Sequence, residues 1–223
     1  MARPYMLYID PVSFGIELTY TLIVVVLCFL VYYRTREIYD LTGYKGIKYF
    51  RYAFLFFGLA YASRLFLYVF LISNIALDLI VPMRTLLPVS SMVVAYLSTM
   101  ALLYMAYTTI WKRLNFEHFL HLSSIIALIV AGLAFASRSP VLVSLVQLLI
   151  LLFIIVISAM KQEKGKKLLP MRAVYYLVSV FWLINLFVLD PMRFLPIELK
   201  VILQIISVAV FLLIYHKVTK WVK

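Results

Sequence analysis

The chain has 223 residues, of which 66% are hydrophobic and only 13% charged, and its formal net charge is +12. Ordinary soluble domains are about 45–50% apolar and about 25% charged, so no soluble fold could bury this much apolar surface. The composition therefore excludes a soluble domain and predicts one membrane domain over residues 1–223. In such a protein the basic excess favours contact with anionic headgroups over nucleic-acid binding.

Seven apolar runs are long enough to cross a hydrocarbon core of about 30 Å. They cover approximately 11–33, 50–73, 85–111, 118–137, 139–160, 172–190 and 196–216. The first lacks a basic leader and a small-residue cleavage site, so we interpret it as a spanning helix and not a signal peptide. The sequence predicts an all-α, polytopic bundle of seven transmembrane helices, multi-pass in the cell membrane.

The distribution of basic residues predicts the orientation of this bundle. Most of the 21 lysines and arginines fall in the connections 34–51, 112–117 and 161–172 and in the tail. Because cytoplasmic connections carry the excess of Lys and Arg, these segments are placed in the cytoplasm. The N-terminus is then outside and the C-terminus inside.

Glu17 in the first span and Arg64 in the second carry the main site prediction. Charged groups inside a span are costly and usually face the bundle interior. At about 1.5 Å per residue they lie roughly 9 and 13 Å below the outer ends of their spans, so we expect an ion pair. The pair is either purely structural or part of a pocket in which Arg64 meets an anionic group of a ligand. A third interpretation is an arginine that snorkels to the surface.

Other polar residues of the second and third spans extend this candidate site. Tyr61, Arg64 and Tyr68 share one helical face, which should face protein or water. The third span is dense in hydroxyls: Ser90, Ser91, Tyr96, Ser98, Thr99, Tyr104, Tyr107 and Thr108. These hydroxyls either line a pocket or serve close helix packing.

The later spans contribute single polar or aromatic residues. His118 and His121 begin the fourth span, where solvated interfacial groups are favoured over a metal site. Gln147, Asn185 and Gln204 can each bond across helices. Trp182 is either a pocket wall or packing.

An ordered set of matches predicts an internal repeat. Pro82-Met83-Arg84 introduces the third span and Pro191-Met192-Arg193 the seventh, whereas the same tripeptide at 170–172 lies on the opposite side. The further matches, in chain order, are Arg51 with Arg172, Arg64 with Asn185, and Trp111 with Trp221. Spans one to three thus correspond to spans five to seven in a parallel 3+1+3 repeat. Its units are about 11–111 and 139–221, joined by the helix at about 118–137.

This arrangement resembles the broad seven-helix superfamily that links SWEET-type sugar carriers, the KDEL receptor, microbial rhodopsins and G-protein-coupled receptors. The resemblance covers the topology of nearly the whole chain and includes no diagnostic motif. Lys200 lies near the outer surface, where it could not hold retinal in mid-membrane, and no proline is followed by glutamine as in PQ-loop carriers. Parallel repeats about the membrane normal are a known transporter design.

We therefore expect a carrier-like protein that binds a small polar or anionic ligand between two three-helix units. The alternatives are a membrane sensor or receptor acting through basic cytoplasmic loops, and a non-catalytic subunit of a membrane complex. Paired buried carboxylates, phosphate loops and nucleophile motifs are missing, so neither an enzyme nor a cofactor is expected. The candidate ligand-binding residues are Arg64, Glu17, Tyr61, Tyr68, Tyr96, Ser98, Asn185 and Trp182. Expected partners are lipids with anionic headgroups, a second copy or a cytoplasmic protein, and no nucleic acid.

Overall fold

The computed structural model describes residues 11–76, 83–110, 119–137, 140–160, 169–188 and 196–220. This part of the chain forms seven α-helices: α1 (Pro11–Thr42), α2 (Lys45–Ala76), α3 (Met83–Ile110), α4 (Phe119–Ser137), α5 (Pro140–Met160), α6 (Leu169–Val188) and α7 (Ile197–Thr219). The all-α expectation is confirmed, and each helix overlaps one predicted span. The sequence matches at Trp111, Trp221 and 191–193, together with His118, lie outside the described residues.

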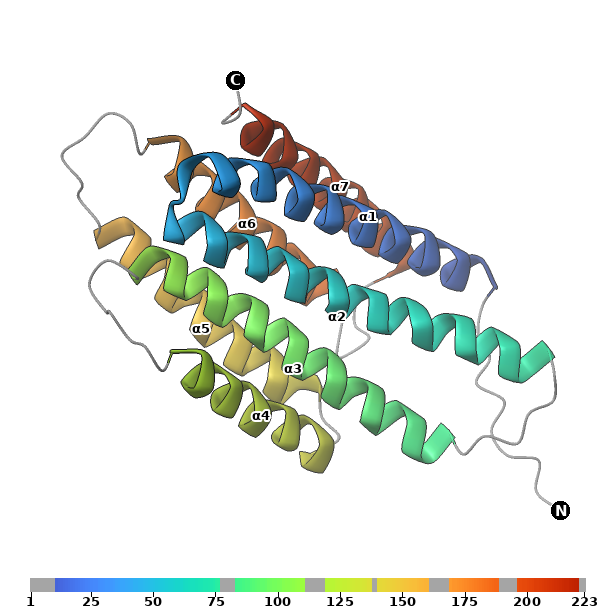
Figure 1. Cartoon of the computed structure of the whole chain (residues 1–223). Helices are drawn as coiled ribbons and strands as arrows, with labels where there is room; N and C mark the ends of the chain where they lie inside the picture. The colour runs from blue at the N-terminus through green and yellow to red at the C-terminus, as the bar shows by residue number, and fades with distance from the viewer. Residues whose placement is uncertain are drawn as a thin grey trace, which may run out of the picture.

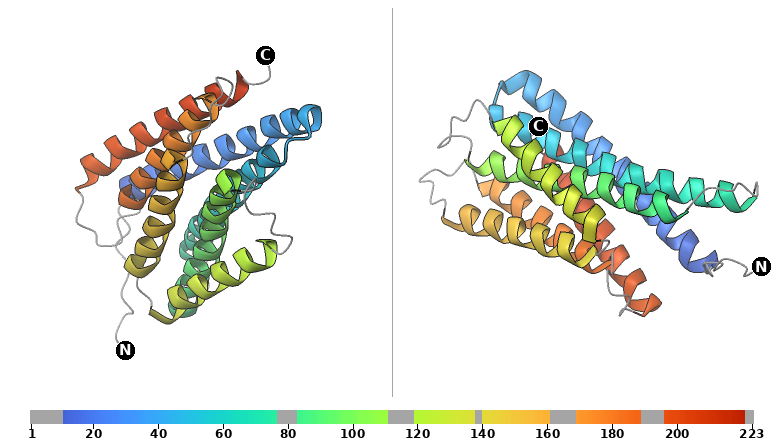
Figure 2. Two further views of the ribbon diagram at one scale, coloured as in Figure 1. Left: turned by 90° about the vertical axis from the view of Figure 1, so that its left-hand side faces the viewer. Right: turned by 90° about the horizontal axis from the view of Figure 1, so that it is seen from below.

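Successive helices run in opposite directions (Figure 1). Six of them form a closed ring, because the contacts run from α1 to α2, α3, α5, α6, α7 and back to α1. The fourth helix packs only on α3 and α5, at the edge of the bundle (Figure 1). From the side, α6 and α7 lie away from α3 and α4, and α5 connects the two sets because it contacts α3, α4 and α6 (Figure 2). The parallel repeat and the orientation of the termini stay predictions.

The outside of this bundle is apolar, the reverse of a soluble protein. Leu128 of α4, Leu149 of α5 and Ile205 of α7 are each more than 60% exposed. Five helices are long and apolar enough to cross a membrane, over Val12–Thr42, Lys45–Ser73, Leu86–Thr109, Phe119–Ser137 and Ile197–Thr219. The apolar stretches of α5 and α6, Val141–Ile157 and Ala173–Val188, are shorter. Five of the seven predicted spans are thus matched by helices of sufficient length.

The prediction of a connection over 34–51 is wrong, because both flanking helices continue through most of it. Only Gly43 and Tyr44 separate α1 from α2, and Gly43 adopts φ +62° while its N–H donates to the Tyr39 carbonyl at 2.8 Å. The charges that suggested a connection form pairs along α1 instead, Arg34 with Glu37 and Arg36 with Asp40. With 32 residues, α1 is about 48 Å long and exceeds a hydrocarbon core of about 30 Å.

Large aromatic side chains fill the centre of the ring. The ring centroid of Phe57 on α2 lies 4.5 Å from that of Trp182 and 5.3 Å from that of Phe181, both on α6. Phe211 of α7 packs edge-on against Phe181 at 4.8 Å and against Phe54 at 5.8 Å. Side chains of this size join α2 to α6 across the ring although the two backbones do not touch.

Candidate functional site

A buried polar network joins four helices near the centre of the bundle. Its members are Tyr20 of α1, Tyr61 of α2, Asn185 of α6 and Ser207 of α7, each less than 10% exposed. The hydroxyls of Tyr20 and Tyr61 both donate to Asn185 Oδ1, the first at 2.6 Å. Asn185 Nδ2 donates to the Phe181 carbonyl at 2.7 Å and to Ser207 Oγ at 3.1 Å. Asn185 thereby uses both donors and accepts two hydrogen bonds, so its amide is fully satisfied.

The direction of every bond in this network follows from the inventory of protons. Tyr20 has one hydroxyl proton, which it donates to Asn185. In its 2.9 Å contact with Ser207, therefore, Ser207 is the donor. Because Asn185 donates to Ser207 in turn, Tyr20, Asn185 and Ser207 form a closed hydrogen-bond cycle. Bonds in such a cycle polarise one another and hold α1, α6 and α7 in one register.

A second polar group lies on the side of Tyr61 toward the predicted outer end of α2. Tyr68 donates its hydroxyl proton to Glu17 Oε2 at 2.9 Å and accepts a bond from Arg64 Nη2 at 3.3 Å. The Arg64 guanidinium also lies over the Tyr61 ring, 5.8 Å from its centroid, within the range of a cation–π contact. Arg64 thus contacts the two tyrosines that share its helical face, and Tyr68 links it to α1.

The predicted direct ion pair between Glu17 and Arg64 is also wrong. Within the described ranges the ion pairs are Arg34 with Glu37 and Arg36 with Asp40. The reason is geometric: Arg64 and Tyr68 are four residues apart on one helical face, and the phenol stands between guanidinium and carboxylate. Arg64 was expected to reach Glu17 directly by extending its side chain along the bundle, and instead Tyr68 connects the two.

Tyr61 belongs to both polar groups and connects them. Its ring receives the Arg64 guanidinium, and its hydroxyl donates to Asn185. A continuous path of contacts therefore runs from Glu17 on α1 through α2 to the seam between α6 and α7. Five of the eight candidate residues lie on this path: Glu17, Arg64, Tyr61, Tyr68 and Asn185.

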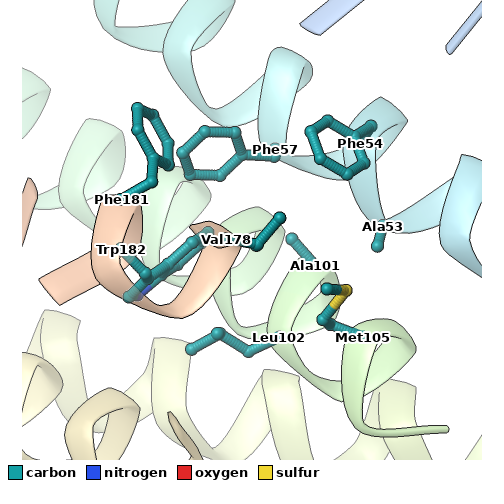
Figure 3. A pocket seen from close by; sticks show the side chains of 9 residues that line it. All are labelled: Ala53, Phe54, Phe57, Ala101, Leu102, Met105, Val178, Phe181 and Trp182. Carbon is teal, nitrogen blue, oxygen red and sulfur yellow. The ribbon is translucent and has the colours of Figure 1, made fainter. Parts of the chain in front are cut away.

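The other three candidates lie elsewhere. Ser98 of α3 is buried and accepts a 2.6 Å bond from Gln147 Nε2 of α5, which confirms that Gln147 bonds across helices. Tyr96 packs against the apolar core. Trp182 lines a cavity between α2, α3 and α6 whose other walls include Phe57 and Leu102 (Figure 3).

This cavity does not suit a polar ligand. All nine lining residues are apolar or aromatic: Ala53, Phe54, Phe57, Ala101, Leu102, Met105, Val178, Phe181 and Trp182. The space open to the centre of a water molecule is about 20 Å³. That is enough for about one water, yet an apolar cavity of this kind stays dry because it offers no hydrogen-bond partners. Trp182 is therefore the wall of an apolar space.

Two members of the central network, Tyr20 and Ser207, were absent from the predicted site. Tyr20 lies near the middle of the predicted span 11–33 and not at either end, where tyrosine anchors a span, and this position is a signal of a buried hydroxyl. Ser207 follows Arg193 at the same sequence interval as Ser98 follows Arg84. If Arg193 is aligned with Arg84 as in the predicted repeat, Ser207 corresponds to Ser98, which is already one of the predicted site residues.

The chain is similar in sequence to a protein of an archaeon. This chain is 32% identical to an uncharacterized protein of Archaeoglobus fulgidus over an alignment of 222 residues, which covers 95% of each chain. The two proteins belong to one family. The unmatched part of the chain is shorter than α4, the smallest helix, so the relationship includes at least part of every helix. No family model and no solved structure matches the chain.

Proposed function

We propose that this family member is a seven-helix integral membrane protein of carrier type that binds a small anionic ligand at Arg64. The observation that carries the proposal is that the Arg64 guanidinium forms no direct ion pair with a carboxylate of the described residues. The guanidinium lies inside the bundle and reaches the Glu17 carboxylate only through the Tyr68 hydroxyl. A ligand carboxylate or phosphate would form a direct charge-assisted bond there, which is stronger than the bond to a neutral phenol.

The surface of the bundle supports a membrane location. Exposed leucine, isoleucine and phenylalanine side chains cover α4, α5 and α7, while the amides Gln147, Asn185 and Gln204 are buried together with the hydroxyls of Ser98 and Ser207. A bilayer solvates the first group, and helix–helix contacts satisfy the second. On this basis α5 and α6 also span, which gives the seven crossings and the outside N-terminus that the basic residues predict.

The order of helices in the ring supports two pseudo-equivalent units. Exchange of α1, α2 and α3 with α5, α6 and α7 leaves every contact of the ring in place, and α4 stands outside it. The matched serines agree, because each bonds to the first helix of the other unit. Ser98 of α3 bonds to Gln147 of α5, and Ser207 of α7 bonds to Tyr20 of α1.

In a carrier, the ligand must change the contact between the two units. Tyr61 is placed for this task, because it touches both Arg64 and Asn185. A ligand anion that draws the guanidinium off the Tyr61 ring would alter the bond that links α2 to α6. The aromatic residues Phe57 and Trp182 then close the path toward the predicted cytoplasmic end. The proposal includes no catalytic step.

Ligand binding is tested by thermal unfolding of the purified protein in detergent. The panel consists of sodium salts of monocarboxylates, dicarboxylates, phosphate and sulfate, with neutral sugars for comparison. A ligand at about 100 times its Kd stabilises the folded state by about 2.7 kcal/mol, which gives a clear rise in Tm. The rise should disappear in Arg64→Met and persist in Arg34→Met, which removes an arginine from the exposed end of α1.

The compound that gives the largest shift is then tested for uptake into proteoliposomes. Flux that depends on Arg64 supports the carrier. Binding without flux rejects transport and retains the site, whereas the absence of any Arg64-dependent shift rejects the site itself.

Orientation is tested by cysteine labelling in a Cys28→Ala background. Thr42→Cys should react only from the cytoplasmic side and Ala76→Cys only from outside. We choose position 42 and not the adjacent turn residue Gly43, because Gly43 has a left-handed backbone conformation in which a cysteine would be strained. Labelling of Thr42→Cys from outside would reverse the topology.

A sensor or receptor is the second candidate, and the long α1–α2 hairpin favours it. The two helices continue past the apolar part of α1 as a packed pair that carries Arg34, Arg36 and Lys45. Such a pair could dock a soluble partner. Reproducible co-purification of one soluble protein, lost when the hairpin is shortened, would favour this function over transport.

A further inference from the structure

Arg51, in the second turn of α2, is surrounded by three tyrosine rings. Its guanidinium carbon lies 5.1 Å from the ring centroid of Tyr32, 5.3 Å from that of Tyr52 and 5.9 Å from that of Tyr39. All three distances are within the range of cation–π attraction, about 6 Å. Tyr32 and Tyr39 share one face of α1, and Tyr52 comes from α2. We call these four residues the Arg51 cage.

The positive charge in the Arg51 cage has no anionic partner among the described residues. The two carboxylates of α1 near this end of the hairpin pair with other arginines, Glu37 with Arg34 and Asp40 with Arg36. The Nε atom of Arg51 is buried and lacks a hydrogen-bond acceptor in the same part of the chain. The tyrosines contact the guanidinium as π-systems and accept none of its hydrogen bonds. Arg51 as a whole is only partly buried, so its terminal N–H groups, unlike Nε, are available to an anion from outside the chain.

The position of the cage along the hairpin indicates the source of that anion. Towards the apolar side Leu30 is exposed, and towards the other side Arg36 and Asp40 are exposed. The cage thus marks the change from apolar to charged surface, where the headgroups of a bilayer lie. Tyr33, which is 60% exposed, packs edge-on against Tyr32 of the cage and extends it to the surface.

We propose that the Arg51 cage binds the phosphate of an anionic membrane phospholipid. A guanidinium presents its N–H donors as a planar fork that matches two phosphate oxygens. The tyrosine rings hold this fork in one orientation, so less side-chain freedom is lost when the phosphate binds. Exposed Leu30 and Tyr33 offer apolar surface to the acyl chains. This site is independent of the ligand proposed at Arg64, on the other half of α2.

The proposal is tested by measuring the affinity of the purified protein for dioctanoyl phosphatidylglycerol, with inorganic phosphate and dioctanoylglycerol as comparison probes. Arg51→Gln should weaken lipid binding about tenfold or more, because a charge-assisted, bidentate contact is lost. Lys48→Gln removes the same charge one turn away and should weaken binding about threefold or less, the effect of a screened surface charge. Tyr39→Leu should weaken binding, whereas Tyr39→Phe keeps the ring and should not.

Three results would overturn the proposal. Equal losses in Arg51→Gln and Lys48→Gln would show general attraction to a basic surface. Inorganic phosphate that binds as tightly as the lipid would identify a soluble anion as the occupant. Dioctanoylglycerol that binds equally well, with the same dependence on Arg51, would exclude the phosphate. Should Arg51→Gln fail to elute as folded protein, Arg51→Lys decides, since it keeps the charge without the fork: unchanged affinity would reject the site.

Discussion

Replacement of Asn185 by leucine tests the central network, because the two side chains are similar in size and leucine cannot form hydrogen bonds. The Tyr61 hydroxyl loses its acceptor, and an orphaned buried donor costs about 1–3 kcal/mol. Tyr20 and Ser207 each lose a bond to Asn185 and keep the bond to one another. At about 0.6 kcal/mol for each bond lost in a membrane bundle, we expect the free energy of unfolding to fall by about 2–4 kcal/mol.

The decisive result comes from a second change in the same protein. Tyr61→Phe alone removes one bond and should cost about 0.6 kcal/mol. Added to Asn185→Leu, it removes the orphaned hydroxyl, so the double variant should be more stable than Asn185→Leu by about 1–2 kcal/mol. Tyr68→Phe, whose hydroxyl bonds to Glu17 and Arg64 instead, should give no such rescue.

The assay is equilibrium unfolding in mixed detergent micelles, followed by the helical circular dichroism signal. An Asn185→Leu variant as stable as the wild type would show that the network does not contribute. A double variant in which the two losses simply add would show that Tyr61 and Asn185 are not coupled. Either result would refute the reasoning, and equal rescue by Tyr68→Phe would show that the effect is not specific.

Two further predictions concern α1 and α2. Tyr68→Phe should abolish the energetic coupling between Glu17 and Arg64 in a double-mutant cycle, because its hydroxyl is the bridge between them; coupling that survives would indicate a direct ion pair. Gly58→Ala should destabilise the protein by about 1–3 kcal/mol, since an added Cβ would lie 3.0 Å from a Cβ of α1. The matched control, Gly15→Ala, meets no atom within 4 Å and should be neutral or stabilising by up to about 1 kcal/mol in the thermal unfolding of both variants.

Sequence reasoning located the helices and much of the polar site, for physical reasons that can be stated. Apolar runs of sufficient length can be read directly, and a charge inside a span signals a buried contact, as it did at Arg64. The depth of a residue along its helix can also be estimated from the sequence, and Arg64 and Glu17 do lie close enough in depth to bond to the same residue, Tyr68. What depth does not give is the rotation of each helix about its axis. That rotation places the Tyr68 hydroxyl between them.

The errors have a similar origin. Arg34 and Arg36 indicated a connection because charge usually ends a span, yet both arginines pair with carboxylates along α1 and the helix continues to Thr42. A serine or tyrosine in mid-span is compatible with either packing or hydrogen bonding. Only the tertiary structure shows that Tyr20 donates a hydrogen bond to the Asn185 amide and that Ser207 accepts one from it.

The closed cycle of Tyr20, Asn185 and Ser207 has a consequence for the membrane as an electrical insulator. A path of polar side chains that begins at a carboxylate could leak protons and dissipate the gradient across the bilayer. Proton relays are built from Asp, Glu and His, which take up and release protons. Here the path from Glu17 ends at an amide whose donors are all engaged, and the Tyr61 hydroxyl proton points inward to that amide. For a bundle that spans the membrane as proposed, we therefore expect the network to hold polar groups together in the interior without conducting protons through it.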